Sequence, residues 1–261
     1  MTIDSSRRAA LVGFGALAAG TTALAACPSC AATTERIIAA GAEELSELMG
    51  RLSRAPRRRD FKTVPMILET PDLWDDGALK EVIAYRGTRK QVWDNTNLAG
   101  PWLNLMRNSI NAQIFSFGHK DFLAVSATHG TAHLALFDQP MWDKYDLAAL
   151  AGDKFKTNTL VLPKPTPAAF AQSEDPKSVF GADGDTIPAL RKRGVVFMAC
   201  HNAIWEVTAK LIASGKNPDN APHEVVAAEL TNHLIDGVVL TPGIAATIPE
   251  LQQVGFHYAA S

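Results

Sequence analysis

The sequence lacks an excess of charge of either sign. Its 261 residues carry 25 lysines and arginines against 27 aspartates and glutamates, a formal net charge of -2. Because nucleic-acid binding depends on neutralising many phosphates, this balance argues against a nucleic-acid partner. Cysteine is also scarce, and the three cysteines of the chain are too few for a small domain held together by disulfides.

Several familiar catalytic motifs are missing as well. The chain has no GxxxxGK[ST] loop, no GxGxxG after a predicted strand, no GxSxG and no HExxH. Nucleotide-dependent reactions and the standard hydrolase mechanisms are therefore disfavoured. With 47% hydrophobic and 20% charged residues, the composition is that of a folded protein, not of a disordered chain or a multispan membrane protein.

Residues 1–26 have the features of an export signal. Arg7 and Arg8 precede a stretch rich in alanine, glycine and threonine that ends in small residues. The paired arginines and the weak hydrophobicity resemble a twin-arginine signal, which predicts export to the bacterial periplasm. A retained membrane helix is the alternative, but three glycines interrupt the run at 9–26.

The residues that end this segment allow two kinds of processing. Leu24-Ala25-Ala26-Cys27 fits ordinary cleavage, and it also fits a lipobox in which Cys27 receives a lipid anchor. Cys27 and Cys30 have the CxxC spacing of a redox pair or of half a metal site. A lipidated Cys27 could not pair with Cys30, so the lipobox and the redox pair exclude each other.

Residues 27–62 are expected to form a helix and a basic linker ahead of the folded domain. Apolar residues recur at helical spacing within 33–52, with Thr34 as the expected N-cap. The arginine-rich stretch 51–59 is interpreted as a solvated linker outside the core, with a lipid or partner contact as the alternative.

The remaining chain, 63–261, alternates strand and helix patterns. This alternation indicates an α/β fold, with a parallel sheet of about five strands flanked by helices. The expected strands are 122–127, 195–199, 237–240 and 256–258, with a short strand within 60–68 and a strand or helix end at 79–85. The expected helices are 97–112, 129–137, one capped by Asp185 or Thr186, 202–213, 225–234 and 244–254. Five prolines and no sustained period predict that 138–185 is a surface excursion with at most short helices.

Cys200 is the main candidate for chemistry. It ends a predicted buried strand and a helix follows at once, so its sulfur should lie near free N–H groups and the positive end of that helix. Both features favour a thiolate, which can attack a sulfane sulfur and hold it as a persulfide. The simpler alternative is that Cys200 is a small buried hydrophobe.

Three histidines could accompany the cysteine. His129 and His201 each follow a predicted strand, at the edge where open α/β sheets bind ligands, and His133 lies four residues beyond His129 on the same face of the expected helix. With or without Cys200, these imidazoles could bind copper, zinc or a haem iron. In a metal-free site, His129 or His201 could instead orient the Cys200 thiolate. A capping or interface histidine is the simpler interpretation of each.

Two further groups of residues have simpler interpretations. An acidic turn could bind a cation but is interpreted as a solvated loop; it comprises Asp72, Asp75 and Asp76. The five tryptophans are too scattered to form a stacking platform, and we expect them in the core or in oligomer contacts.

Three segments of the chain are informative when they are taken in order. The first is the helix Trp102-Leu-Asn-Leu-Met-Arg-Asn-Ser-Ile-Asn111 followed by Val125-Ser-Ala-Thr-His129-Gly130-Thr-Ala132. The second is Ile187-Pro-Ala-Leu-Arg-Lys-Arg-Gly194-Val-Val-Phe-Met-Ala-Cys200. The third is Asp236-Gly-Val-Val-Leu-Thr-Pro-Gly243 with Leu251-Gln-Gln-Val-Gly-Phe-His-Tyr258. Together they resemble the DsrE/DsrF-like superfamily of small α/β proteins, and the resemblance spans roughly 79–261.

The resemblance implies a parallel sheet flanked by helices, assembly into homotrimers or hexamers and, in some members, a cysteine that carries sulfur as a persulfide. Cys200 stands at the matching position. We therefore expect a periplasmic protein that handles reduced sulfur through Cys200, with a small sulfur compound or a sulfur-transfer protein as its partner. The alternatives are a metal- or haem-binding protein that uses His129, His133 and His201, and an oligomeric interaction module without chemistry.

Overall fold

The structure is a computed structural model that describes residues 36–162 and 173–261. The predicted export signal, the lipobox and the Cys27–Cys30 pair lie outside the described residues. Within the described ranges, none of the helices combines the length and the apolarity that a bilayer-spanning segment needs.

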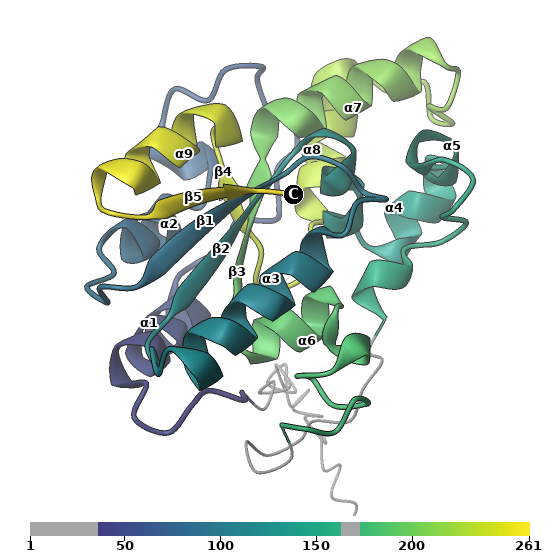
Figure 1. The fold of residues 1–261 in the computed structure, drawn as a ribbon. Helices are drawn as coiled ribbons and strands as arrows, with labels where there is room; N and C mark the ends of the chain where they lie inside the picture. Colours follow the sequence, from purple (N-terminus) through teal and green to yellow (C-terminus); the bar gives the residue numbers. More distant parts are fainter. Residues whose placement is uncertain (1–35, 163–172) are drawn as a thin grey trace, which may run out of the picture. The chain divides into compact units, whose positions relative to one another are not determined.

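Five parallel strands form one sheet, in the order β4-β3-β2-β1-β5 (Figure 1). The strands are β1 Lys90–Asn95, β2 Leu123–Thr128, β3 Val196–Cys200, β4 Val239–Thr241 and β5 His257–Ala260. The chain steps across the sheet from β1 to β4 and then returns to place β5 beside β1. This arrangement confirms the predicted α/β fold with a five-stranded parallel sheet flanked by helices. The strand expected within 60–68 is not formed, and β1 is a strand that the sequence patterns did not predict.

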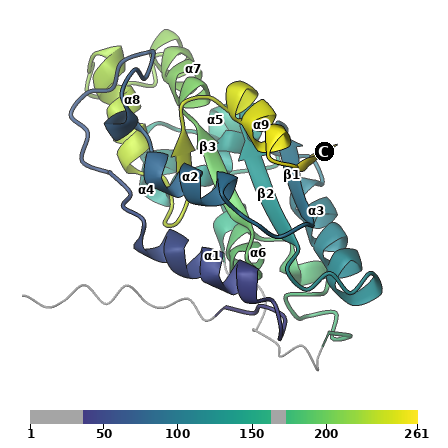
Figure 2. The same cartoon turned by 90° about the vertical axis from the view of Figure 1, so that its left-hand side faces the viewer.

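Helices cover both faces of this sheet (Figure 2). On one face lie α3 Trp102–Asn111, α4 Gln139–Lys144, α6 Ile187–Lys192, α7 His201–Ala213 and α8 His223–Asn232. On the other face lie α1 Glu43–Arg54, α2 Asp76–Ile83 and α9 Ile244–Gln253. Neighbouring residues of β3 alternate between the two cores, with Phe197 and Ala199 in the first and Met198 and Cys200 in the second.

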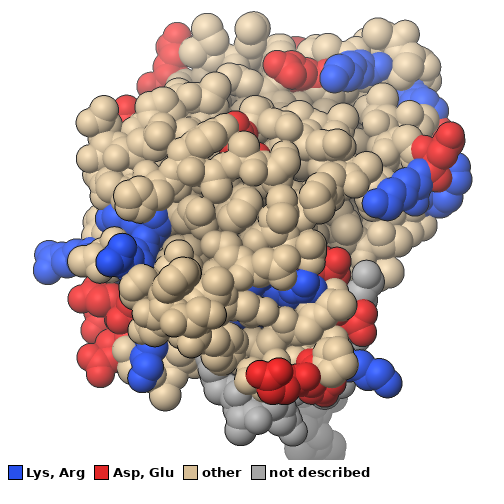
Figure 3. All heavy atoms as spheres, in the orientation of Figure 1, with Lys and Arg blue, Asp and Glu red and all other residues tan. Residues whose placement is uncertain are grey.

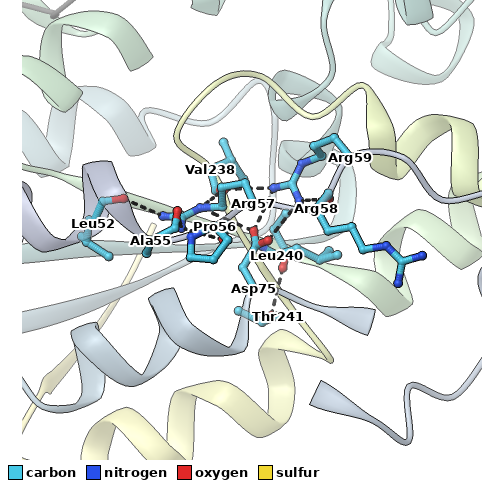
Figure 4. Close-up of polar contacts among 11 residues, drawn as sticks. Leu52, Ala55, Pro56, Arg57, Arg58, Arg59, Asp75, Val238, Leu240 and Thr241 are labelled. Carbon is cyan, nitrogen blue, oxygen red and sulfur yellow. Dashed lines mark hydrogen bonds and ion pairs between the residues drawn. The ribbon is translucent and has the colours of Figure 1, made fainter. Parts of the chain in front are cut away.

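The arginine-rich stretch is not a solvated linker. Arg57 and Arg59 both reach the Asp75 carboxylate, whose side chain is 1% exposed (Figure 4). Arg59 binds it through two nitrogens, at 3.1 and 2.8 Å, and both arginines also donate to the Val238 carbonyl oxygen at 3.2 Å. The Leu240 N–H donates to the same carboxylate at 2.7 Å. These contacts tie the chain to β4, which corrects the solvated interpretations of both 51–59 and Asp75.

Helix α1 begins at Glu43 and not after Thr34. Residues 36–42 run into it without a helical turn of their own, and no side chain caps its first turn at Ala42. Instead the Asp121 carboxylate accepts the Leu45 N–H at 3.1 Å. A distant acid thus satisfies an N–H group of the first turn, which the local pattern did not indicate.

The segment 138–185 has only short helices in its described part, as predicted, but it does not lie entirely on the surface. Met141, Trp142, Tyr145, Leu147 and Phe155 are all buried in the core on the α3 side. Their apolar side chains are grouped in short helices and turns, so no sustained helical period reveals them in the sequence. The helix after this segment begins as expected, because the Thr186 hydroxyl caps α6 by accepting the Ala189 N–H at 3.3 Å.

Candidate functional site

Cys200 is the last residue of β3, and its sulfur lies against the first turn of α9. The Ile244 N–H points at Sγ, with the nitrogen 3.3 Å from the sulfur. We expected this donor to come from the helix that follows Cys200 directly, which is α7. The alternation of β3 explains the difference, because it directs Cys200 to the face that α9 covers, whereas α7 packs on the opposite face.

The surroundings of Cys200 are tightly packed. The residue is 5% exposed and belongs to the core on the α9 side, with Ala203, Ile244 and Ile248. At Gly243, just before α9, an added Cβ would come within 2.9 Å of the Asn202 amide nitrogen. The sulfur is thus shielded from bulk solvent, a setting that suits a small core residue as well as a protected nucleophile.

His129 takes part in a hydrogen-bonded group that joins three strands. Its Nε2 lies 2.7 Å from Oδ1 of Asp94 in β1, and Tyr258 in β5 donates its hydroxyl to Oδ2 of the same carboxylate at 2.7 Å. Because a carboxylate only accepts, Nε2 carries the proton, and in the neutral ring Nδ1 keeps its lone pair. The hydrogen bond to Asp94 raises the pKa of Tyr258.

Cys200 and His129 occupy neighbouring positions at the carboxyl edge. The last pair in register between β2 and β3 is Thr128 with Ala199, so His129 and Cys200 are the next residues on adjacent strands, which run about 4.8 Å apart in a sheet. Val92 and Cys200 both face the α9 side of the sheet. Asp94 lies two residues after Val92 and therefore faces the same side, and so does the His129 ring that it binds. No hydrogen bond between described residues joins the sulfur to an imidazole.

His201 is engaged elsewhere. It is the first residue of α7, it is 1% exposed, and its Nε2 lies 2.8 Å from the Pro65 carbonyl oxygen. Burial lowers its pKa, and its buried Nδ1 has no partner in the described part of the chain. The structure therefore does not support the expected role of His201 in orienting the Cys200 thiolate.

His133 is fully buried in the 3₁₀-helix Gly130–Leu136. Neither ring nitrogen has a hydrogen-bond partner among the described residues. Burial, followed by the charges of His129 and His201, lowers the pKa of His133 to about 3, so the ring is neutral. His129 precedes this helix, and a 3₁₀-helix has about three residues per turn, so His129 and His133 do not share one helical face as the sequence spacing suggested.

The three histidines lie close enough for their charges to interact, but they do not converge. His129 is bound by Asp94 and His201 by Pro65. Within 36–162 and 173–261, no group of three histidine, cysteine, aspartate or glutamate side chains is arranged to hold a metal ion. The metal- or haem-binding alternative built on His129, His133 and His201 therefore has no support from this geometry.

No family model, curated protein or solved structure matches the chain. The resemblance to the DsrE/DsrF-like superfamily thus stays a prediction that rests on the three sequence segments alone. Of the predicted site residues, Cys200 and His129 are the two that occupy neighbouring positions on adjacent strands. Asp94 and the N-terminus of α9 lie at the same edge, and the Tyr258 hydroxyl reaches Asp94 from β5; none of these was identified from the sequence.

Proposed function

We propose that the protein takes up a sulfane sulfur atom on Cys200 and passes it to an acceptor thiol. The observation that carries this proposal is the Ile244 N–H directed at Sγ from the first turn of a ten-residue helix. A donor at the positive end of a helix stabilises negative charge on sulfur, both in the thiolate and in the persulfide anion. The predicted periplasmic location, the homo-oligomer and a small sulfur compound or sulfur-transfer protein as partner belong to the same proposal.

The reaction consists of two displacements at sulfur. In the first, the Cys200 thiolate attacks the outer, sulfane sulfur of thiosulfate; a new S–S bond forms, the S–S bond of the donor breaks, and sulfite leaves with the bonding electron pair. In the second, an acceptor thiolate attacks the outer sulfur of the persulfide, and Cys200 leaves as a thiolate. One sulfur atom moves, and no external oxidant or reductant is consumed.

His129 supplies the base in this scheme. Its Nε2–H is held by Asp94, so Nδ1 is the nitrogen that accepts the Cys200 proton. Asp94 and Tyr258 are positioning residues, because they fix the ring and its tautomer without touching the sulfur. The arrangement follows the logic of a nucleophile, a base and an orienting carboxylate.

The proposal is tested by treating the full chain with thiosulfate and measuring its intact mass. We expect an adduct of about 32 Da, one sulfur atom, that a second thiol removes. Cys200→Ser abolishes the adduct, whereas the double variant Cys27→Ser, Cys30→Ser keeps it. An absent adduct, or one that survives Cys200→Ser, would overturn the proposal.

The same assay tests the positioning role of Asp94. Asp94→Asn forms the adduct about tenfold more slowly and alters the pH dependence of its rate, because the ring of His129 loses its carboxylate partner. The matched control is Asp138→Asn, which alters the similar pair of Asp138 with His233 at 2.8 Å and leaves the rate unchanged. Equal rates in both variants would remove His129 and Asp94 from the mechanism.

A further inference from the structure

The opposite end of the sheet has two adjoining cavities that the proposed sulfur chemistry does not use. One has a volume of about 380 Å³ and the other about 460 Å³, and both are lined by Arg89 and His119. They lie where β1 begins, at Lys90, and the first also reaches His257 at the start of β5. The six residues of β1 separate this end from the carboxyl edge by about 17 Å.

The lining carries more positive than negative charge. Arg89, Lys90 and Lys120 line the cavities, and none of the three makes an ion pair within the described ranges. The one acid in the lining, Asp121, already accepts the Leu45 N–H. Figure 3 shows lysine and arginine side chains at the left of the molecule, with a separate group of aspartate and glutamate side chains below them. An anion is the ligand charge that this surface attracts.

Lys90 lines the first cavity at the start of β1, but its ammonium points to the opposite face of the sheet, among residues of the core on the α9 side. It is 8% exposed, and its ammonium donates to the Tyr85 carbonyl oxygen at 2.8 Å and lies 5.2 Å from the centre of the Phe256 ring. Burial lowers its pKa. The Lys90 ammonium is therefore already engaged, and Arg89, which lines both cavities, is the cation available to a bound anion.

Aromatic side chains supply the apolar part of the same cavity. Phe117 is 63% exposed and stacks on His119, with the ring centres 6.0 Å apart, and Phe122 forms part of the wall. Gln113 fixes His119 through two contacts. The ring Nδ1 of His119 lies 2.7 Å from Oε1 of Gln113, and the backbone N–H of His119 donates to the backbone carbonyl oxygen of Gln113 at 2.8 Å. Gln113 lies in the π-helix Ala112–Ser116, a rare element that is frequent at functional sites.

We infer that these cavities bind an amphipathic aromatic anion, with its ring against Phe117 and Phe122 and its anionic group near Arg89 and Lys120. The combined size suits a small organic molecule, and the pairing of an exposed ring with unpaired cations selects a ligand that has both features. This binding site is independent of Cys200. The sulfur-transfer assay and the binding assay therefore succeed or fail separately.

The probe is 8-anilinonaphthalene-1-sulfonate, an aromatic sulfonate, added to the full folded chain at neutral pH. We expect saturable one-to-one binding by fluorescence titration, which weakens as ionic strength rises. N-phenyl-1-naphthylamine, which has the same rings without the sulfonate, binds at least about tenfold more weakly because it lacks the charge.

Two variants and one matched control locate the site. Arg89→Gln and Phe117→Ser each weaken sulfonate binding about tenfold, and Arg89→Gln leaves binding of the neutral probe unchanged. The control is Arg86→Gln, which removes a nearby exposed arginine that lines neither cavity and preserves the affinity. Circular dichroism and thermal melting establish that each variant is folded. Non-saturable binding, or equal effects of the two arginine variants, would overturn the inference.

Discussion

Two groups of basic side chains in this molecule have opposite surroundings. Arg57 and Arg59 hold a buried carboxylate and a strand carbonyl between them, at Asp75 and Val238. The basic residues around the cavities, such as Arg89 and Lys120, have no ion-pair partner among the described residues. The first group stabilises the fold, whereas the second is free to bind a ligand.

The difference shows that the density of charge in a sequence does not reveal its role. The stretch 51–59 is the most basic part of the chain, yet two of its arginines, Arg57 and Arg59, are satisfied by the buried acid Asp75 and by the Val238 carbonyl, far along the chain in sequence. The residues that line the two cavities come from four separate segments, at 41, 88–91, 113–122 and 257, and form no basic run. What distinguishes the groups is the position of the acceptor, which only the fold determines.

The difference between the two groups of basic residues is tested most directly by removing the buried acid Asp75. Asp75→Ala leaves two half-buried guanidinium groups and the Leu240 N–H without their acceptor. Because one partner of a buried ion pair is lost, we expect the free energy of unfolding to fall by about 3–5 kcal/mol. Urea denaturation followed by circular dichroism measures this change.

The matched control is an acid three residues earlier. Asp72 pairs with Arg58 at 3.4 Å, but its side chain is 67% exposed, so water replaces the lost contact. Asp72→Ala should therefore change the free energy of unfolding by less than about 0.5 kcal/mol. Similar losses in the two variants would show that burial does not distinguish the two acids.

Local patterns predicted those parts of the fold that depend on nearby residues. The strand predicted at 122–127 appears as β2, Leu123–Thr128, and the strand predicted at 195–199 appears as β3, Val196–Cys200, each shifted by one residue. Thr186 caps α6 because its hydroxyl and the Ala189 N–H that it accepts lie within one turn. The position of Cys200 at the end of its strand also follows from nearby residues, because the apolar run 195–199 directly precedes it.

The parts of the fold and of the site that the sequence did not predict depend on contacts between distant segments. β1 combines charged and apolar residues, and it becomes a central strand only because β2 and β5 pair with it on both sides. Asp94 could not be assigned to the site without β1. The N–H at Cys200 comes from α9, a helix that begins more than forty residues later. Sequence order alone favoured α7, which is nearer along the chain but covers the other face.

His133 provides a second test of how burial affects a basic side chain. Its ring is buried without a hydrogen-bond partner among the described residues, and it stays neutral. The pKa of His133 is about 3 in the folded chain, against 6.5 for an ordinary histidine. The unfolded chain therefore takes up the proton first, so stability present above pH 6.5 is lost as the pH falls toward 3. As the pH falls from 6.5 to 4, His133 lowers the free energy of unfolding by roughly 3 kcal/mol, and the variant His133→Leu does not show this loss.

The measurement is the free energy of unfolding as a function of pH for the two chains. His257→Leu is the control, since His257 is exposed and its replacement preserves the acid dependence. At neutral pH His133→Leu is neutral or stabilising, because both ring nitrogens lack partners. An unchanged acid slope in His133→Leu would contradict the burial of a neutral ring.

Arg193 gives the smallest and sharpest test, because it is a buried cation without an acid. It is 3% exposed, its three guanidinium nitrogens have no hydrogen-bond partner in the described part of the chain, and it lies over the Phe180 ring at 4.8 Å. Burial and then the charge of Arg107 lower the pKa of Arg193 to about 9. Arg193→Met fills similar space without an unpaired charge, so we expect the free energy of unfolding to rise by about 1–2 kcal/mol. Lys192→Met, one residue earlier and partly exposed, is the control and should change it by less than about 0.5 kcal/mol. A loss of stability in Arg193→Met would mean that its guanidinium is paired as Arg57 and Arg59 are, and the contrast between paired and unpaired buried cations would disappear.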